Sequence, residues 1–205
     1  MTDRFEELFN YLDLFHGKNN YKNKMIQNFK EEFQKYTMSD HCRSSHQISR
    51  PIEEYFINEI SNNLQKYKNK SFEEIFKYVN QIISKPVSKG GGKLNQKYGS
   101  RGIGVLGCYD ISIALIKSIP GCSLPNKIYL IKDSSKGPWN YTTKILNINP
   151  IKVNEEWCGK HNIYYLNKEE LLNNIINTKE YQKIVEMNCD DIESYLCNCW
   201  KLHRK

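Results

Sequence analysis

Three glycines in the stretch YGSRGIGVLGCYD, between Tyr98 and Asp110, are the residues whose spacing most directly suggests chemistry. Gly102, Gly104 and Gly107 form the pattern G-x-G-x-x-G. Glycine lets a backbone approach a phosphate closely, because it has no Cβ and adopts positive φ angles without strain. The pattern admits three interpretations: a dinucleotide-binding loop, a turn that contacts a nucleic-acid backbone, or a turn that serves packing alone.

The dinucleotide interpretation requires a strand that leads into the glycines and an acidic residue about twenty positions later that binds ribose. The residues before Gly102 read GKLNQKYGSR, which is not a strand pattern. Asp133, which follows the strand-like run KIYLI, lies well beyond the expected distance. The surroundings of the motif therefore disfavour a dinucleotide, and no other cofactor is predicted.

Basic residues precede the glycine turn, with Lys or Arg at every fourth position from Lys85 to Arg101. Mobile cationic side chains beside donating backbone N–H groups suit a phosphate chain, although a solvated loop has the same composition. The formal net charge of +7 also favours a polyanionic partner through long-range attraction. The residues predicted to contact nucleic acid are Lys93, Lys97, Arg101, Gly102 and Gly104.

Four polar side chains form a second candidate site, of the kind that an enzyme would use. Asp110 would serve as a general base if desolvated, or would favour the helix dipole as a carboxylate near the helix start. His46 and Arg50 are four residues apart, so we expect them on one side of a helix or loop. There they would either bind an anion or substrate or anchor the loop by hydrogen bonds. If the chain is an enzyme, we expect His46, Arg50, Tyr109 and Asp110 to converge on one pocket as its catalytic residues.

Apolar residues at spacings of three and four predict that the chain is mainly α, with one minor strand element. Ser71 and Glu74 match the capping-box pattern and give the clearest helix start. The run KIYLI predicts a strand, ILNINPIKV is ambiguous, and DSSKGPWN predicts a turn that exposes Trp139. The predicted helices span residues 4–15, 25–36, 52–67, 71–84, 105–119, 168–177 and 190–202.

The length of 205 residues suits one domain over 1–205, with an N-terminal helical segment over 1–38 and a Gly/Lys-rich loop over 85–101. A loop of that length is uncommon in a compact domain unless it is functional or mobile. The N-terminus lacks the architecture of a signal peptide, and no run of about eighteen apolar residues occurs. The sequence therefore predicts a cytoplasmic protein that does not contact a membrane.

The seven cysteines are odd in number and unevenly spaced, so they do not form a secreted disulfide framework. Four residues near the C-terminus are of types that bind metals, namely Cys189, Cys197, Cys199 and His203. The C-x2-C pair that structural zinc sites normally use does not occur in the sequence. Buried free thiols are the simpler expectation, and no metal is predicted.

The stretch RGIGVLGCYDISIALI, together with the earlier helix SFEEIFKYVNQIIS, resembles the helix-hairpin-helix superfamily, which includes DNA-binding modules and the DNA base-excision glycosylases. Taken in order, HCRSSHQISR, SFEEIFKYV, RGIGVLGCYDISIALI with LPNKIYLI, and DDIESYLC resemble, more narrowly, a small uncharacterised bacterial family. The superfamily resemblance implies that Gly102, Gly104 and the following helix N-terminus hold a phosphate oxygen, with Arg101 beside them. Unlike the glycosylases, this chain has Val105 and Leu106 where those enzymes commonly place Lys, and it lacks their Val-Asp-Thr-His segment.

The sequence therefore predicts a compact, mainly helical domain that binds DNA phosphates through a helix-hairpin-helix-like glycine turn. The resemblance to glycosylases leaves a base-processing activity open. One alternative is a small-molecule or nucleotide-binding enzyme with the His/Arg/Tyr/Asp pocket. The other is a protein-interaction module without catalysis. Oligomeric state is not predicted.

Overall fold

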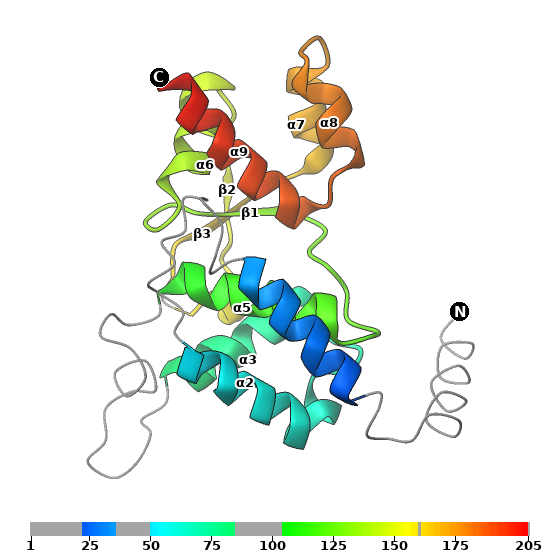
Figure 1. The fold of residues 1–205 in the computed structure, drawn as a ribbon. Coiled ribbons are helices and arrows are strands. Elements are labelled where there is room, and N and C mark those ends of the chain that lie inside the picture. The colour runs from blue at the N-terminus through cyan, green and yellow to red at the C-terminus, as the bar shows by residue number, and fades with distance from the viewer. Residues whose placement is uncertain (1–21, 36–49, 85–103, 160, 205) are drawn as a thin grey trace.

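Two groups of helices lie on opposite faces of a small sheet in the computed structural model, which describes residues 22–35, 50–84, 104–159 and 161–204 (Figure 1). One group consists of the helix over 22–35 with α2 (Arg50–Asn63), α3 (Phe72–Ser84) and α5 (Val105–Ser118). The other consists of α6 (Lys136–Asn140), α7 (Lys168–Ile175), α8 (Glu180–Glu186) and α9 (Cys189–His203). The predicted fold class, mainly α with a minor strand element, is confirmed.

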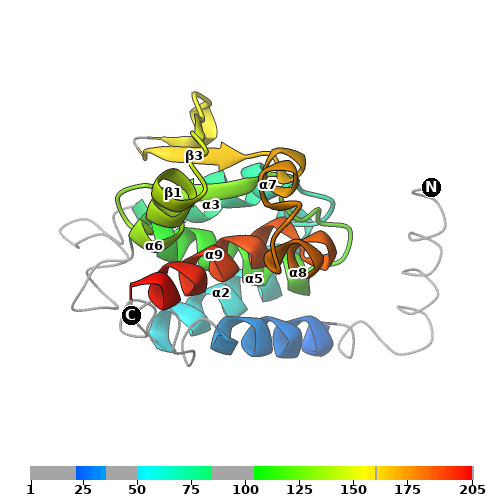
Figure 2. The ribbon, with the colours of Figure 1, turned by 90° about the horizontal axis from the view of Figure 1, so that it is seen from above.

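The sheet has three antiparallel strands in the order β1-β3-β2, with β1 at Ile128–Ile131, β2 at Ile151–Lys152 and β3 at Ile163–Leu166. Successive side chains of a strand point to opposite faces. Tyr129 and Ile131 accordingly join the hydrophobic cluster of α3 and α5, whereas Ile128 and Leu130 join the cluster of α7 and α9. The sheet is thus a middle layer with helices on both faces (Figure 1), and the view from above looks through these stacked layers (Figure 2).

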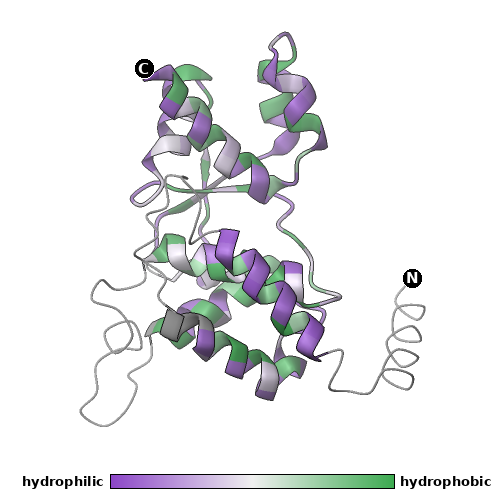
Figure 3. Ribbon diagram, viewed as in Figure 1, coloured by the Kyte–Doolittle hydropathy of each residue, from purple (hydrophilic) through white to green (hydrophobic). Residues whose placement is uncertain are grey.

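The helix over 22–35, α2, α3 and α5 lie below the sheet in Figure 1 and are called the lower helices. They form where local sequence signals are strong. The backbone N–H of Ser71 donates to Glu74 at 3.0 Å, and the backbone N–H of Glu74 donates to the Ser71 hydroxyl at 3.3 Å, so the predicted capping box is present. The outer helices carry hydrophilic and hydrophobic residues side by side (Figure 3), as helices with one face on the core do. The predicted helices at 25–36, 52–67, 71–84, 105–119, 168–177 and 190–202 are confirmed with small changes at their ends.

The turn predicted at DSSKGPWN is confirmed at Asp133 and Ser134. It is wrong from Lys136 onward, because Lys136–Asn140 is α6 and a π-helical turn follows at Tyr141–Ile145. Pro138 fits in the first turn of a helix, where its missing N–H is not needed. Gly137 lets α6 approach α9, since a Cβ there would lie 2.9 Å from the Cys197 sulfur. Trp139 is half-buried, with its ring centroid 4.7 Å from that of Tyr164, so it is not the exposed ring that was expected.

Strand β3 and helix α8 were not predicted from the sequence. The predicted helix over 4–15 and the whole predicted loop over 85–101 fall outside the described residues. None of the helices within the described ranges combines the length and the apolar composition needed to cross a bilayer.

Candidate functional site: the glycine turn before helix α5

Helix α5 runs through the core between the other lower helices and the sheet (Figures 1 and 2). Thirteen of its fourteen residues are buried, and only Lys117 is partly exposed. A helix that is buried on all sides needs apolar residues all round. The first turn of α5 is therefore held by packing, and Gly104, just before it, reaches the surface.

Gly104 is the N-cap of α5, in an extended conformation with φ −80° and ψ 178°. Among the described residues no side-chain hydrogen bond caps the helix, and its first turn contains no acidic residue. The first N–H groups of a helix have no partner within the helix, and the helix dipole places partial positive charge there. A Cβ at Gly104 would meet no atom within 4 Å, so the described structure leaves the space beside the turn open.

The other helices show how this N-terminus differs. Helices α3, α7 and α9 each carry two acidic residues in the first turn, which complement the dipole. Helix α8 carries Glu180 there. Among α3, α5, α7, α8 and α9, only α5 has no such carboxylate. The short helix α6 also has none. The positive end of α5 is therefore open to an anion from outside the protein.

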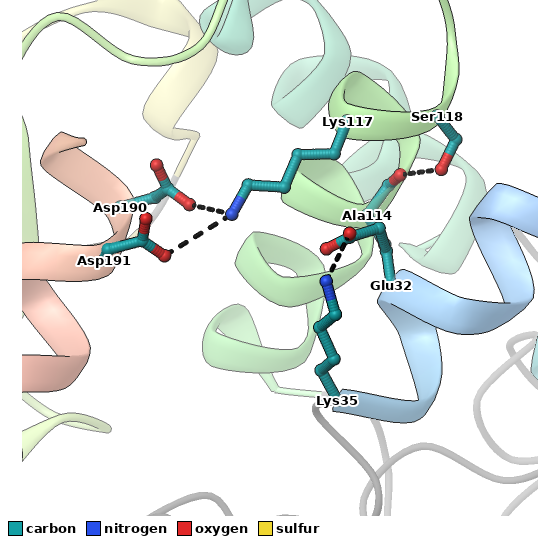
Figure 4. Close-up of polar contacts among 7 residues, drawn as sticks. All are labelled: Glu32, Lys35, Ala114, Lys117, Ser118, Asp190 and Asp191. Carbon is teal, nitrogen blue, oxygen red and sulfur yellow. Dashed lines mark hydrogen bonds and ion pairs between the residues drawn. The ribbon is translucent and has the colours of Figure 1, made fainter. Parts of the chain in front are cut away.

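The C-terminal end of α5 is anchored by charge (Figure 4). Lys117 Nζ lies 2.6 Å from Asp190 Oδ2 and 3.4 Å from Asp191 Oδ1, in the first turn of α9. The Asp190 side chain is only 3% exposed, and its burial raises its pKa, an effect that the hydrogen bond and charge of Lys117 partly offset. Glu32, on the helix over 22–35, adds a third carboxylate near Lys117 and pairs with Lys35. The ion pairs of Lys117 with Asp190 and Asp191 tie α5 to α9.

Burial by itself would lower the pKa of Lys117. The hydrogen bond that Lys117 donates to Asp190 and the charges of Asp190, Asp191 and Glu32 outweigh that effect, so the pKa of Lys117 is raised. The raised pKa of Asp190 and the raised pKa of Lys117 are physically consistent. The cost of burial falls mainly on Asp190, the more buried partner, whereas three carboxylates stabilise the charged form of the partly exposed Lys117. Lys117 therefore stays charged as the anchor of α5.

Tyr109 and Asp110 both lie inside the protein, at 2% and 3% exposure. The Tyr109 ring packs edge-on against Phe72 with centroids 5.3 Å apart. Burial, followed by the charge of Asp110, raises the pKa of Cys108 to about 12. Asp110 lies beyond the first turn of α5, so its interpretation as a dipole-stabilising carboxylate at the helix start is wrong.

The structure tests the predicted convergence of the four enzyme-like residues only in part. His46 lies outside the described residues, and Arg50 is described only as the first residue of α2. Their proximity to Tyr109 and Asp110 stays a prediction. Of the predicted nucleic-acid contacts, Gly104 is described, whereas Lys93, Lys97, Arg101 and Gly102 lie outside the described residues.

The sulfur chemistry differs from the expectation at one position. Five cysteines are free thiols, namely Cys108, Cys122, Cys158, Cys189 and Cys199. Cys197 is disulfide-bonded, so the expectation of a buried free thiol is wrong there. Within the described ranges, no three His, Cys, Asp or Glu side chains are grouped in a way that would hold a metal ion.

Comparison with known proteins leaves the geometry as the basis for a functional conclusion. No protein-family model matches the chain, and no curated protein or solved structure matches it either. The resemblance to helix-hairpin-helix proteins therefore stays a prediction, and the site must be judged by its own charges and contacts.

Proposed function

We propose that this protein binds the phosphate backbone of DNA through the glycine turn at the N-terminus of α5. The observation that carries the proposal is Gly104, an exposed and uncapped N-cap that begins a helix otherwise buried in the core. Donating N–H groups and the helix dipole favour an anion at such a position. Because packing already holds α5, binding there would not require the helix to become ordered first.

The pairing of α3 with α5 supports a helix-hairpin-helix-like arrangement. Among the helices and strands labelled in Figure 1, these two make the most extensive contact. Their packing includes the Phe72 ring of α3 against the Tyr109 ring of α5. The long segment between the two helices therefore does not keep them apart, and the glycine turn leads into the second member of a packed pair.

The formal net charge of +7 supports a polyanion as the ligand. Lys93, Lys97 and Arg101 precede the turn in the sequence, and we propose that they add contacts to flanking phosphates. Phosphate contacts position a protein on DNA without reading its sequence, so we expect binding with little sequence preference.

Replacement of Gly104 by Asp, with Asn as the matched control, tests the proposal. Both residues are good N-caps, and the extended backbone and open space at Gly104 accept either side chain. The two variants should therefore fold with equal stability in urea unfolding. Only Gly104→Asp places a negative charge where the phosphate would lie, so it should bind a labelled DNA duplex more weakly than Gly104→Asn in fluorescence anisotropy.

Salt dependence provides the second measurement. Each phosphate contact contributes about 0.9 to the slope of log affinity against log salt on duplex DNA. Arg101→Ala should lower the slope by about that amount. Equal binding by the Asp and Asn variants, or no binding of the wild type at about 50 mM salt, would contradict the proposal.

Asp110 favours a second candidate function, a small-molecule or nucleotide-binding enzyme. A carboxylate at 3% exposure is costly unless its interactions compensate, and such groups are concentrated at functional sites. In this case Asp110→Asn should keep the folded stability within about 1 kcal/mol and abolish the thermal stabilisation that a bound nucleotide or other ligand causes. Loss of folding in Asp110→Asn would assign the residue to structure instead.

A further inference from the structure

Trp200, in the last turn of α9, is surrounded by cationic side chains. Lys144 Nζ lies 5.9 Å from the centroid of its ring, and Arg204 Cζ lies 6.0 Å from it. The His203 ring is stacked on the indole, with centroids 6.3 Å apart and an interplanar angle of 23°. Lys144 comes from the π-helical turn at Tyr141–Ile145, so two elements build this group, which we name the Trp200 patch.

The Trp200 patch lies at the surface and keeps its positive charge. Lys144, His203 and Arg204 are exposed, and Trp200 is half-buried. In the part of the chain that the structure describes, neither of the two cationic side chains, Lys144 and Arg204, forms an ion pair. Several other lysines do so, as Lys117 does with Asp190.

Stabilisation of α9 explains the Trp200 patch only in part. Basic side chains in the last turn complement the helix dipole, which accounts for His203 and Arg204. It does not account for Lys144, which belongs to another element, or for the partial exposure of an indole ring. An aromatic ring among unneutralised cations is the arrangement that stacks an unpaired base while cations meet the adjoining phosphates.

We propose that the Trp200 patch is a second nucleic-acid contact, which takes an unpaired base of a single strand. The inference rests on the proposed function of the glycine turn. The first turn of α5 and the last turn of α9 both lie toward the left in the two ribbon views, with α9 above the sheet and α5 below it in Figure 1 (Figures 1 and 2). A strand held at the glycine turn would therefore run along this edge, past the sheet, to reach Trp200.

The first experiment measures binding of a labelled oligothymidine about 15 nucleotides long by fluorescence anisotropy, with variants of Trp200. Trp200→Ala should weaken binding about fivefold or more, because stacking of one base on an aromatic side chain has that effect. Trp200→Phe keeps an aromatic face and should retain most of the affinity. Urea unfolding of each variant verifies that α9 is intact. Equal affinity of wild type and Trp200→Ala would overturn the proposal.

The second experiment measures the salt dependence of the same binding. The double variant Lys144→Gln with Arg204→Gln should lower the slope of log affinity against log salt by about 1.4, which corresponds to two phosphate contacts on a single strand. Lys22→Gln with Lys24→Gln is the matched control, because it removes the same charge at the start of the helix over 22–35, toward the opposite side (Figure 1). An equal fall in slope in the control would assign the effect to net charge and overturn the proposal.

The two proposals fail in different ways. If Gly104→Asp weakens binding and the Trp200 patch variants do not, the patch proposal is overturned and the glycine turn stands. If the patch variants alone weaken binding, the glycine turn is not the contact and the patch is supported. Absence of binding to both duplex and single strand at low salt would overturn both.

Discussion

Replacement of Lys117 by Met tests how α5 is held in place. The substitution removes the cation that lies 2.6 Å from Asp190 and leaves a carboxylate at 3% exposure without its partner. Loss of one member of a buried ion pair costs about 3 to 5 kcal/mol. Because Lys117 is 22% exposed, we expect the lower end, about 3 kcal/mol. For a chain of this size, the melting temperature should fall by about 6 to 12 °C.

The reasoning also predicts how the stability loss of Lys117→Met changes with pH. Burial raises the pKa of Asp190 above its unfolded value of 3.8, and Lys117 partly offsets that effect. The folded protein therefore binds this proton more tightly than the unfolded chain, and the resulting stability is lost as the pH rises through the folded pKa. Without Lys117 the folded pKa rises further. The deficit of Lys117→Met relative to wild type should thus shrink between pH 7 and pH 5 in urea unfolding.

Two further variants distinguish the destabilising effect of an unpaired buried charge from the effect of lost packing. Asp190→Asn leaves Lys117 with Asp191 and with solvent, so it should cost only about 1 kcal/mol. The double variant with Lys117→Met should recover part of the loss, because it contains no uncompensated carboxylate at position 190. A deficit in Lys117→Met that is the same at both pH values, or that the second substitution does not reduce, would refute the electrostatic reasoning.

Three further substitutions address the backbone and the core, and each is measured by the free energy of unfolding in urea. Gly121→Ala should lose more than about 1 kcal/mol, because Gly121 has φ +81° and a Cβ there would overlap the Asn69 side chain. Gly104→Ala should lose no more than about 1 kcal/mol, because its φ is −80° and the space beside it is open, so that only the poorer N-cap preference of Ala acts against it. Tyr129→Phe should lose about 1 kcal/mol, because it removes the 2.7 Å hydrogen bond to Glu73, with the m-value unchanged.

Local signals account for what the sequence could predict of the fold. The capping box at Ser71 and the apolar run after Gly104 are properties of neighbouring residues, and α3 and α5 begin where those signals lie. The start of α6, Lys-Gly-Pro, is instead typical of a turn, and its helical form goes with close packing of Gly137 on Cys197. Strand β3 pairs with both β1 and β2, and pairing of this kind leaves no periodic signal in four residues.

The same distinction applies to the candidate sites. Gly104 was recognisable because its motif is contiguous, and the structure places it at the N-cap of α5. The Lys117–Asp190 pair and the approach of Lys144 to Trp200 join residues far apart in the chain, so no spacing in the sequence could indicate them. Tyr109 and Asp110 were expected near a site, and their burial is compatible with either a pocket or the core.

The two ends of α5 differ in a way that packing alone does not explain. At the C-terminal end, Lys117 complements the helix dipole and is itself neutralised by Asp190 and Asp191. At the N-terminal end, the partial positive charge meets neither an acidic residue of the first turn nor a capping side chain. A Ser, Asp or Asn at position 104 would fit the extended backbone and would stabilise the helix by a few tenths of a kcal/mol relative to Gly. Neither strain nor crowding from the described residues requires glycine there, and the proposed phosphate contact would supply a physical reason for it.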